Sequence, residues 1–299
     1  MIFAKKFRFN FVRVLVVISA CVLGGVAYFG FSYLQSVKIS REIVSKPDVT
    51  TLPPDVQQEL AASPTPAPQL PEKLRLPILM YHYVEYVKDK GDTIRQSLNT
   101  TPYTFERQLI TLKDAGYTFL TPSDLVSALE GRSKLPQKPI ILSFDDGYRD
   151  FYTDAFPLLK KYNAKAVQYV IAGFLGKPNF MYKSQVEELG KSGLVEVGAH
   201  TVHHLWLKQL NPKTVTYEVE ESKKALEKIL GATIHSFAYP YGAFDEQTIT
   251  IVKVAGFTNA MSTIPGTEIT EQNRYFLYRL RPGGRTGQQL LDYLEKAKF

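Results

Sequence analysis

The chain has 299 residues, a formal net charge of +7 and one cysteine, Cys21. Four of the positive charges precede residue 14, which leaves +3 for the remainder. So small an excess argues against a nucleic-acid partner, and no stretch resembles a nucleic-acid-binding module. Because Cys21 has no second cysteine to pair with, an internal disulfide is excluded and stability has to come from a hydrophobic core.

Residues 14–37 contain no charged side chain and are largely apolar, and residues 1–13 carry four basic residues but no acidic one. A helix of about twenty apolar residues is roughly 30 Å long and spans a bilayer. The charge bias places residues 1–13 in the cytoplasm and the rest of the chain outside. We therefore predict one transmembrane helix in a single-pass protein of the cell membrane.

Other interpretations of this segment stay open. A charged start followed by an apolar run also describes a cleaved signal peptide, although this run is longer than a usual signal core. Residues 18–21 (Ile-Ser-Ala-Cys) resemble a lipoprotein processing site, but the chain stays apolar as far as Phe31. A buried core helix would seldom lack a polar face over this length.

Residues 38–73 are rich in Pro, Ser, Thr and Ala and lack the apolar periodicity of a packed element. Such a composition favours extended, semi-rigid conformations. We interpret it as an extracytoplasmic linker to a domain over residues 74–299. A Pro-rich recognition ligand is the alternative, but no clear P-x-x-P element with a flanking basic residue stands out.

From residue 74 onward, short apolar runs alternate with helical patterns. Strands are predicted over 78–83, 118–121, 140–144, 166–171, 195–199, 236–238 and 258–262. Helices are predicted over 105–115, 122–129, 152–162, 184–192, 212–230, 246–255 and 288–298, four of them closed by glycines at 116, 193, 231 and 256. This alternation predicts an α/β fold with a parallel sheet, whose catalytic loops gather at the carboxyl ends of its strands.

The helix predicted over 212–230 carries acidic and basic residues close together. Its glutamates Glu218, Glu220 and Glu221 precede three lysines, and Glu220 and Lys224 form a favourable i,i+4 pair. We interpret this charge cluster, Glu218 included, as a solvated face.

Two adjacent carboxylates, Asp145 and Asp146, follow the strand predicted over 140–144, and His200 and His204 follow the strand predicted over 195–199. Neighbouring carboxylates are both comfortably ionised only when a cation neutralises them, so Asp146 with the two histidines would bind a metal. Asp145 is then free to take a proton from water. Zinc suits one carboxylate and two imidazoles, and cobalt or nickel would also fit. Taken alone, the two aspartates followed by glycine are also typical of a turn, and the two spaced histidines could be unrelated to each other.

These residues resemble the motifs of polysaccharide deacetylases, the NodB-homology group that forms carbohydrate esterase family 4. The first motif, T/S-F-D-D-G, stands at 143–147, the second, H-S/T-x-x-H, at 200–204, and an aromatic loop ending in P-Y-G at 237–242. The resemblance covers residues 74–299 and implies a distorted (β/α)7-like barrel. It also implies that the third motif, with Tyr239, Pro240, Tyr241 and Gly242, contacts substrate and that a backbone N–H near Tyr241 binds the oxyanion.

The chain departs from the family pattern in two places. Ala238 replaces an arginine that orients the catalytic aspartate, and the C-terminal segment has no histidine to act as general acid. The run ending in His82 resembles the branch that deacetylates poly-N-acetylglucosamine, in which an N-terminal strand supplies the acid, so the resemblance assigns this role to His82. A structural histidine is the alternative. Arg279 or Arg281 could supply the absent guanidinium.

The resemblance implies an enzyme that removes N-acetyl groups from N-acetylglucosamine residues of an extracytoplasmic glycan, such as peptidoglycan, poly-N-acetylglucosamine or a chito-oligosaccharide. The alternatives are an O-acetyl polysaccharide esterase and a glycan-binding pseudoenzyme. Trp206 is either a core residue or a platform for a sugar ring. We expect a monomer whose partners are the glycan and the membrane.

Overall fold

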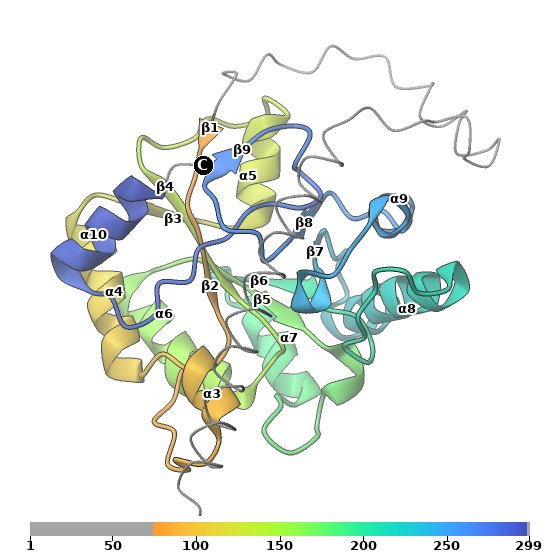
Figure 1. Ribbon diagram of the computed structural model, residues 1–299, viewed down its shortest axis with the longest axis horizontal. Coiled ribbons are helices and arrows are strands. Elements are labelled where there is room, and N and C mark those ends of the chain that lie inside the picture. Colours follow the sequence, from red (N-terminus) through yellow and green to blue (C-terminus); the bar gives the residue numbers. More distant parts are fainter. Residues whose placement is uncertain (1–73, 298–299) are drawn as a thin grey trace, which may run out of the picture. The chain divides into compact units, whose positions relative to one another are not determined.

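The computed structural model describes residues 74–297 (Figure 1). The predicted cytoplasmic start, transmembrane helix and linker, at 1–13, 14–37 and 38–73, lie outside the described residues. Within 74–297 no helix has both the length and the apolar character needed to cross a membrane.

Seven parallel strands form the central sheet. They are β2 (Ile78–Tyr81), β3 (Thr118–Leu120), β4 (Pro139–Phe144), β5 (Ala166–Val170), β6 (Val195–Ala199), β7 (Ser236–Ala238) and β8 (Asn259–Met261). Their order is β2-β4-β5-β6-β7-β8, and β3 pairs with the start of β4, while β5 pairs with its end. The predicted α/β fold with a parallel sheet is confirmed.

The sheet curves into a half-barrel, and the segment 277–280 spans the gap between its two edge strands. Leu277 bridges to Met261 of β8, and Leu280 bridges to Leu79 of β2. The Met80 N–H donates to the Leu280 carbonyl at 2.8 Å, which fixes the register of the segment beside β2. Arg279, which lies between these two bridges, points to the inside of the curved sheet, where its guanidinium reaches Asp145.

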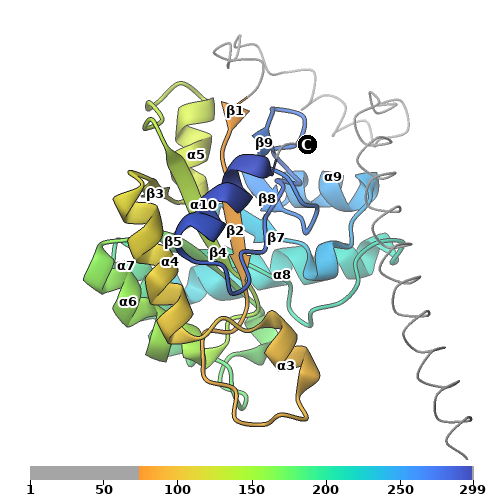
Figure 2. The same ribbon diagram turned by 60° about the vertical axis from the view of Figure 1, so that its left-hand side comes forward.

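Helices cover the outer face of the sheet, and α10 packs beside α4 (Figures 1 and 2). The helices are α3 (Thr93–Leu98), α4 (Pro102–Asp114), α5 (Pro122–Leu129), α6 (Phe156–Tyr162), α7 (Lys183–Lys191), α8 (Pro212–Leu230), α9 (Glu246–Val254) and α10 (Gly287–Lys296). The four predicted glycine caps are confirmed, since Gly116, Gly193, Gly231 and Gly256 all have left-handed φ angles between 64° and 81°.

Three local features differ from the sequence prediction. The helix predicted over 152–162 begins as a π-helical turn, η2 (Phe151–Ala155), because Pro157 at the start of α6 lacks an N–H and its ring crowds the preceding turn. Helix α3 was not predicted, since it buries none of its residues and so has no apolar face. The antiparallel pair β1 (Leu74–Arg75) and β9 (Glu268–Ile269) is too short to show a pattern.

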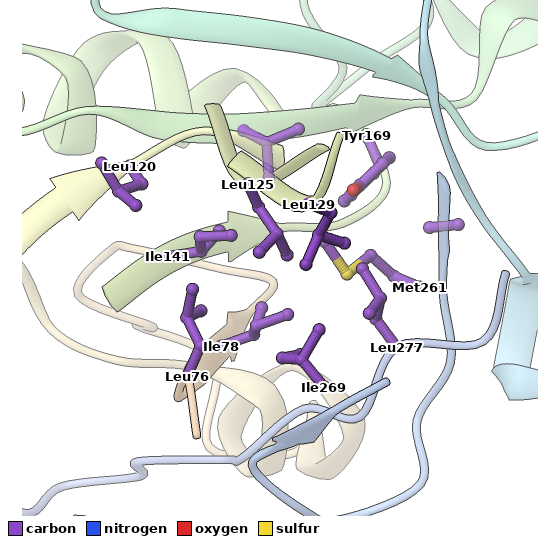
Figure 3. Packing of buried hydrophobic residues seen from close by; sticks show 12 residues of the cluster. Leu76, Ile78, Leu120, Leu125, Leu129, Ile141, Tyr169, Met261, Ile269 and Leu277 are labelled. Atoms are coloured by element: carbon purple, nitrogen blue, oxygen red, sulfur yellow. The ribbon is translucent and has the colours of Figure 1, made fainter. Parts of the chain in front are cut away.

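Along β4, the inside of the half-barrel changes from apolar to polar. Its apolar end is filled by side chains from several strands and from α5, including Ile78, Ile141, Met261 and Leu125 (Figure 3). Along β4 the inward positions after Ile141 are Ser143 and Asp145, which both contact Arg279. Along β4, polar side chains are thus confined to the carboxyl end of the strand.

Asp150 joins the loops that follow β4 and β2, because its carboxylate accepts a hydrogen bond from the Val84 N–H. Burial raises the pKa of Asp150 to about 7, with the negative charges of Glu85 and Asp154 adding to the effect and the Val84 N–H opposing it. A carboxyl whose pKa is raised on folding binds its proton more tightly in the folded protein. Stability is therefore lost as the pH rises from about 4 through about 7.

We predict that Asp150→Asn raises the free energy of unfolding at pH 8 by on the order of 1 kcal/mol and changes it little at pH 4. Asparagine keeps an acceptor for the Val84 N–H without the buried charge. Urea unfolding of both proteins at the two pH values measures the difference. An equal change at both would contradict the raised pKa.

Candidate metal and catalytic site

The loops after four parallel strands converge at one edge of the sheet. His82 follows β2, Asp145 and Asp146 follow β4, His200 follows β6, and the turn η4 (Pro240–Gly242) follows β7. Because carboxyl ends of parallel strands share one edge, residues more than 100 positions apart meet there.

Asp146, His200 and His204 form a group with the geometry of a metal site, since one ligand atom from each lies within 4.8 Å of the others. Asp146 Oδ1 is 3.3 Å from Nε2 of each histidine. Neither approach has hydrogen-bond geometry, and this buried oxygen has no hydrogen-bond partner among the described residues. A buried carboxylate oxygen facing two imidazole nitrogens without hydrogen bonds fits a divalent cation.

The backbone sets the orientation of His200. Its Nδ1 lies 2.7 Å from the Ala238 carbonyl, so Nδ1 carries the hydrogen and Nε2 is left with its lone pair toward Asp146. Burial by itself raises the pKa of Asp146, but the imidazoles of His200, His204 and His82 outweigh it and hold that pKa well below its usual range. The carboxylate is therefore ionised and able to bind a cation.

Backbone strain is concentrated at this site. Asp146, Thr201, His204 and Tyr241 have φ between 58° and 75°, a conformation that non-glycine residues seldom adopt. Each such residue costs about 1–3 kcal/mol and persists only when its surroundings enforce it. Gly147, with φ of 80°, lies beside Val170, so a Cβ there would be both strained and crowded.

Asp145 is buried and paired with Arg279. Both carboxylate oxygens accept hydrogen bonds from the guanidinium, at 2.7 and 2.8 Å. Arg279 is also buried and donates further to the Ser262 carbonyl and the Ser143 hydroxyl. Burial alone raises the pKa of Asp145, but the charge of Arg279, with smaller effects of His200 and His82, lowers it below its ordinary value. Arg281 is exposed and makes no hydrogen bond or ion pair with Asp145 in the described part of the chain.

His82 lies beside the same carboxylate, with Nε2 3.9 Å from Asp145 Oδ2. Burial lowers the pKa of His82, the positive charges of Arg281 and Arg279 lower it further, and the negative charges of Asp145 and Asp146 oppose them without reversing the shift. His82 thus lies next to Asp145 and is not one of the three residues of the metal group.

In the loop of the third motif, residues 237–242, some side chains are buried and others are exposed. Tyr239 is fully buried, its hydroxyl donates to the Tyr275 carbonyl, and Pro240 is buried too, so neither side chain faces substrate as the resemblance implied. Tyr241 is 59% exposed, and its ring lies 4.5 Å from that of His204. Trp206 is 53% exposed and 6.0 Å from Tyr241, which excludes a core position. Position 242 requires glycine, because a Cβ there would clash with the side chain of Thr263.

The interpretation of Glu218 as part of a solvated face is wrong. Glu218 is only 1% exposed, and its carboxylate contacts the loop that carries His204. A signal was available in the sequence, since Glu218 follows Val215 by three residues and precedes Leu226 by eight. Both spacings place these residues on one face of a helix, and that face is buried. The imidazole of His203 faces Glu218, with Nδ1 2.7 Å from Oε1 of that carboxylate. His203 is not part of the metal group.

The sequence analysis also missed an aromatic wall beside Asp146. Tyr148 stacks on Tyr83 at 4.0 Å and on Phe180 at 4.9 Å. Burial raises the pKa of the Tyr148 phenol, and the charge of Asp146 raises it further, so the hydroxyl stays protonated. Tyr83 and Phe180 lie outside every motif, and only packing brings them here.

Comparisons with known proteins agree with this geometry. Residues 132–260 match the polysaccharide deacetylase family. A Bacillus subtilis protein named for this family, YxkH, is 32% identical over 225 residues, covering 75% of this chain and 77% of that protein. A poly-β-1,6-N-acetyl-D-glucosamine N-deacetylase of Staphylococcus aureus is 29% identical over 189 residues, which are 59% of this chain and 65% of that enzyme.

Among solved structures, the Streptococcus pyogenes deacetylase PplD in complex with acetate superimposes with a TM-score of 0.69. It is 32% identical in sequence, and the match covers 76% of this chain and 100% of that chain.

We predict that Arg279→Ala lowers the free energy of unfolding by about 3–5 kcal/mol, because it leaves the Asp145 carboxylate buried without its partner. The matched change Arg281→Ala, two residues along the same segment and exposed, should alter stability by no more than about 0.5 kcal/mol. Chemical unfolding measures both. Similar losses in the two variants would show that the pairing of Arg279 with Asp145 is not what stabilises this segment.

Proposed function

The chain belongs to the polysaccharide deacetylase family, and we propose that it removes N-acetyl groups from N-acetylglucosamine residues of an extracytoplasmic glycan in a metal-dependent hydrolysis. One observation carries the proposal. The Asp146, His200 and His204 group lies beside an aspartate that Arg279 keeps ionised, and that aspartate lies 3.9 Å from His82. A metal site, a base and an acid are the parts that amide hydrolysis requires.

Asp146, His200 and His204 would hold the metal, and zinc suits this ligand set, although cobalt or nickel would also fit. A divalent cation bound there supplies Lewis acidity, which polarises the amide carbonyl and makes water more acidic. The Ala238 carbonyl keeps the Nε2 lone pair of His200 directed at the site.

Asp145 takes the proton of the attacking water. Its two hydrogen bonds from Arg279 fix the plane of the carboxylate, and the lowered pKa keeps it ionised near neutral pH. A base that is both oriented and charged before substrate arrives avoids reorganisation during the reaction.

His82 protonates the amine nitrogen as the C–N bond breaks. Its Nε2 lies 3.9 Å from Asp145 Oδ2, and an imidazole is the side chain that can both carry a proton and release it near neutral pH. The proton released by water and the proton delivered to the amine balance, so acetate and a free amine are the products.

Tyr241 and Trp206 bind the sugar. The exposed ring of Tyr241 lies beside His204, and the exposed ring of Trp206 lies beside Tyr241. The two rings form an aromatic platform, which is a surface that sugar rings contact well. The backbone N–H of Tyr241 would stabilise the oxyanion of the tetrahedral intermediate.

The location of the enzyme is a further part of the proposal. The uncharged run over 14–37 and the basic start before it support a single membrane anchor, with the linker over 38–73 holding the catalytic domain outside the cytoplasm.

Acetate release by the purified full-length protein tests the proposal on poly-N-acetylglucosamine, peptidoglycan, chito-oligosaccharides and acetylated xylan. We expect release from one or more of the N-acetylated glycans, loss after treatment with a chelator, and recovery when zinc is restored. Release from xylan alone would indicate an O-acetyl esterase. No release from any polymer with metal present would indicate a glycan-binding protein.

We predict that His82→Ala lowers turnover on an N-acetylglucosamine oligomer roughly 10²–10⁴-fold, the usual size of a general-acid contribution, while metal binding is kept. The loss should be smaller on an activated acetate ester, whose leaving group departs without a proton. His235→Ala, at the opposite end of the sheet before β7, is the control. Equal losses on both substrates would assign His82 a positioning role, and an unchanged rate would place the acid elsewhere.

A further inference from the structure

We propose that Glu218, on α8, is the positioning residue that holds the histidine loop, residues 200–204, in its metal-binding conformation. The inference rests on the proposed metal site. Glu218 forms no described hydrogen bond with the side chains of Asp146, His200 or His204, so it would act through the loop backbone.

Every described hydrogen bond and ion pair of the Glu218 carboxylate is made to this loop. Oε2 accepts the backbone N–H groups of Val202 at 2.9 Å and of His203 at 2.8 Å, and Oε1 lies 2.7 Å from His203 Nδ1. No lysine or arginine in the described part of the chain pairs with this carboxylate. A carboxylate that is 1% exposed needs compensation for its lost hydration, and here the loop alone provides it.

The loop needs such an anchor because its backbone is strained. Thr201 and His204 have φ of 65° and 58°, and the β-branched Thr201 is especially unfavourable there. The turn η3 (Ala172–Phe174) also holds the loop, because it donates hydrogen bonds from Ala172 to the Thr201 carbonyl and from Gly173 to the Val202 carbonyl. The strained loop is thus held by hydrogen bonds to η3 and to Glu218, and removal of one of these two partners lets it relax.

The two histidine ligands depend on this anchor to different degrees. His200 is fixed independently, because its N–H donates to the Val170 carbonyl and its Nδ1 contacts the Ala238 carbonyl. His204 lies at the far end of the strained loop and is held there by the bond from its N–H to the Thr201 hydroxyl. Loss of Glu218 should therefore displace His204 and lower the affinity for the metal, because the site loses one of its three ligands.

The test compares zinc binding by the full-length wild-type protein, Glu218→Ala and Glu218→Gln, measured by competition with a chromophoric chelator. We expect Glu218→Ala to bind zinc roughly 10–100-fold more weakly, the usual effect of losing a group that orients a ligand. Glu218→Gln keeps one acceptor oxygen for the two backbone N–H groups and should restore part of the affinity. Should Glu218→Ala not fold, Glu218→Gln carries the test against wild type.

Glu221→Ala is the matched control, since Glu221 lies on the same helix, is 45% exposed and pairs only with Lys224 among the described residues. It should bind zinc as the wild type does. His203→Ala should have a smaller effect than Glu218→Ala, because the two backbone hydrogen bonds to Oε2 remain.

A Glu218→Ala protein that binds zinc with wild-type affinity, whatever its thermal stability, would overturn the inference and leave the proposed function standing. A wild-type protein that binds none of zinc, cobalt and nickel would overturn the metal site itself. A reduced affinity in Glu218→Ala that Glu218→Gln partly restores supports the positioning role, because a purely structural role would lower stability without moving the zinc affinity.

Discussion

The buried pair of Asp145 and Arg279 is the interaction on which the rest of the structure depends. Either charge alone would be costly inside the half-barrel, whereas together they form two parallel hydrogen bonds, and the remaining guanidinium donors reach Ser143 and the Ser262 carbonyl. The pair ties residues 134 positions apart, and so fastens the closing segment to β4. One contact thereby helps to close the sheet and to keep the proposed base ionised.

The position of that pair follows from how the inside of the half-barrel is filled. Apolar side chains such as Ile78 and Ile141 occupy one end, and along β4 the polar groups begin only near the end of the strand (Figure 3). The apolar filling lowers the local dielectric constant, which strengthens the electrostatic contacts of the polar groups next to it. The ligand-bearing loops are then held by buried acceptors, namely the Ala238 carbonyl for His200 and the Glu218 carboxylate for the loop of His204.

The departures from the family pattern are explained by contacts. Ala238 stands where the resemblance places an arginine, and of this residue only the backbone carbonyl contacts the site, at Nδ1 of His200. The guanidinium beside Asp145 comes from the closing segment, which reaches the same carboxylate from another part of the chain. His82 likewise approaches Asp145 from β2, in place of a C-terminal histidine. The contacts around the carboxylate require a donor at a given point in space, and different segments can supply it.

The sequence alone was enough to predict the alternation of strands and helices, the glycine caps, the adjacent carboxylates and the spaced histidines, because each depends on residues close together in the chain. Only the tertiary structure decided between Arg279 and Arg281. The bridges of Leu277 to Met261 and of Leu280 to Leu79 place Arg279 beside Asp145 and leave Arg281 exposed. Only packing buried Glu218 and Tyr239 and left Trp206 exposed. Burial depends on which elements pack together, and a local sequence pattern describes only one of the two elements in each contact.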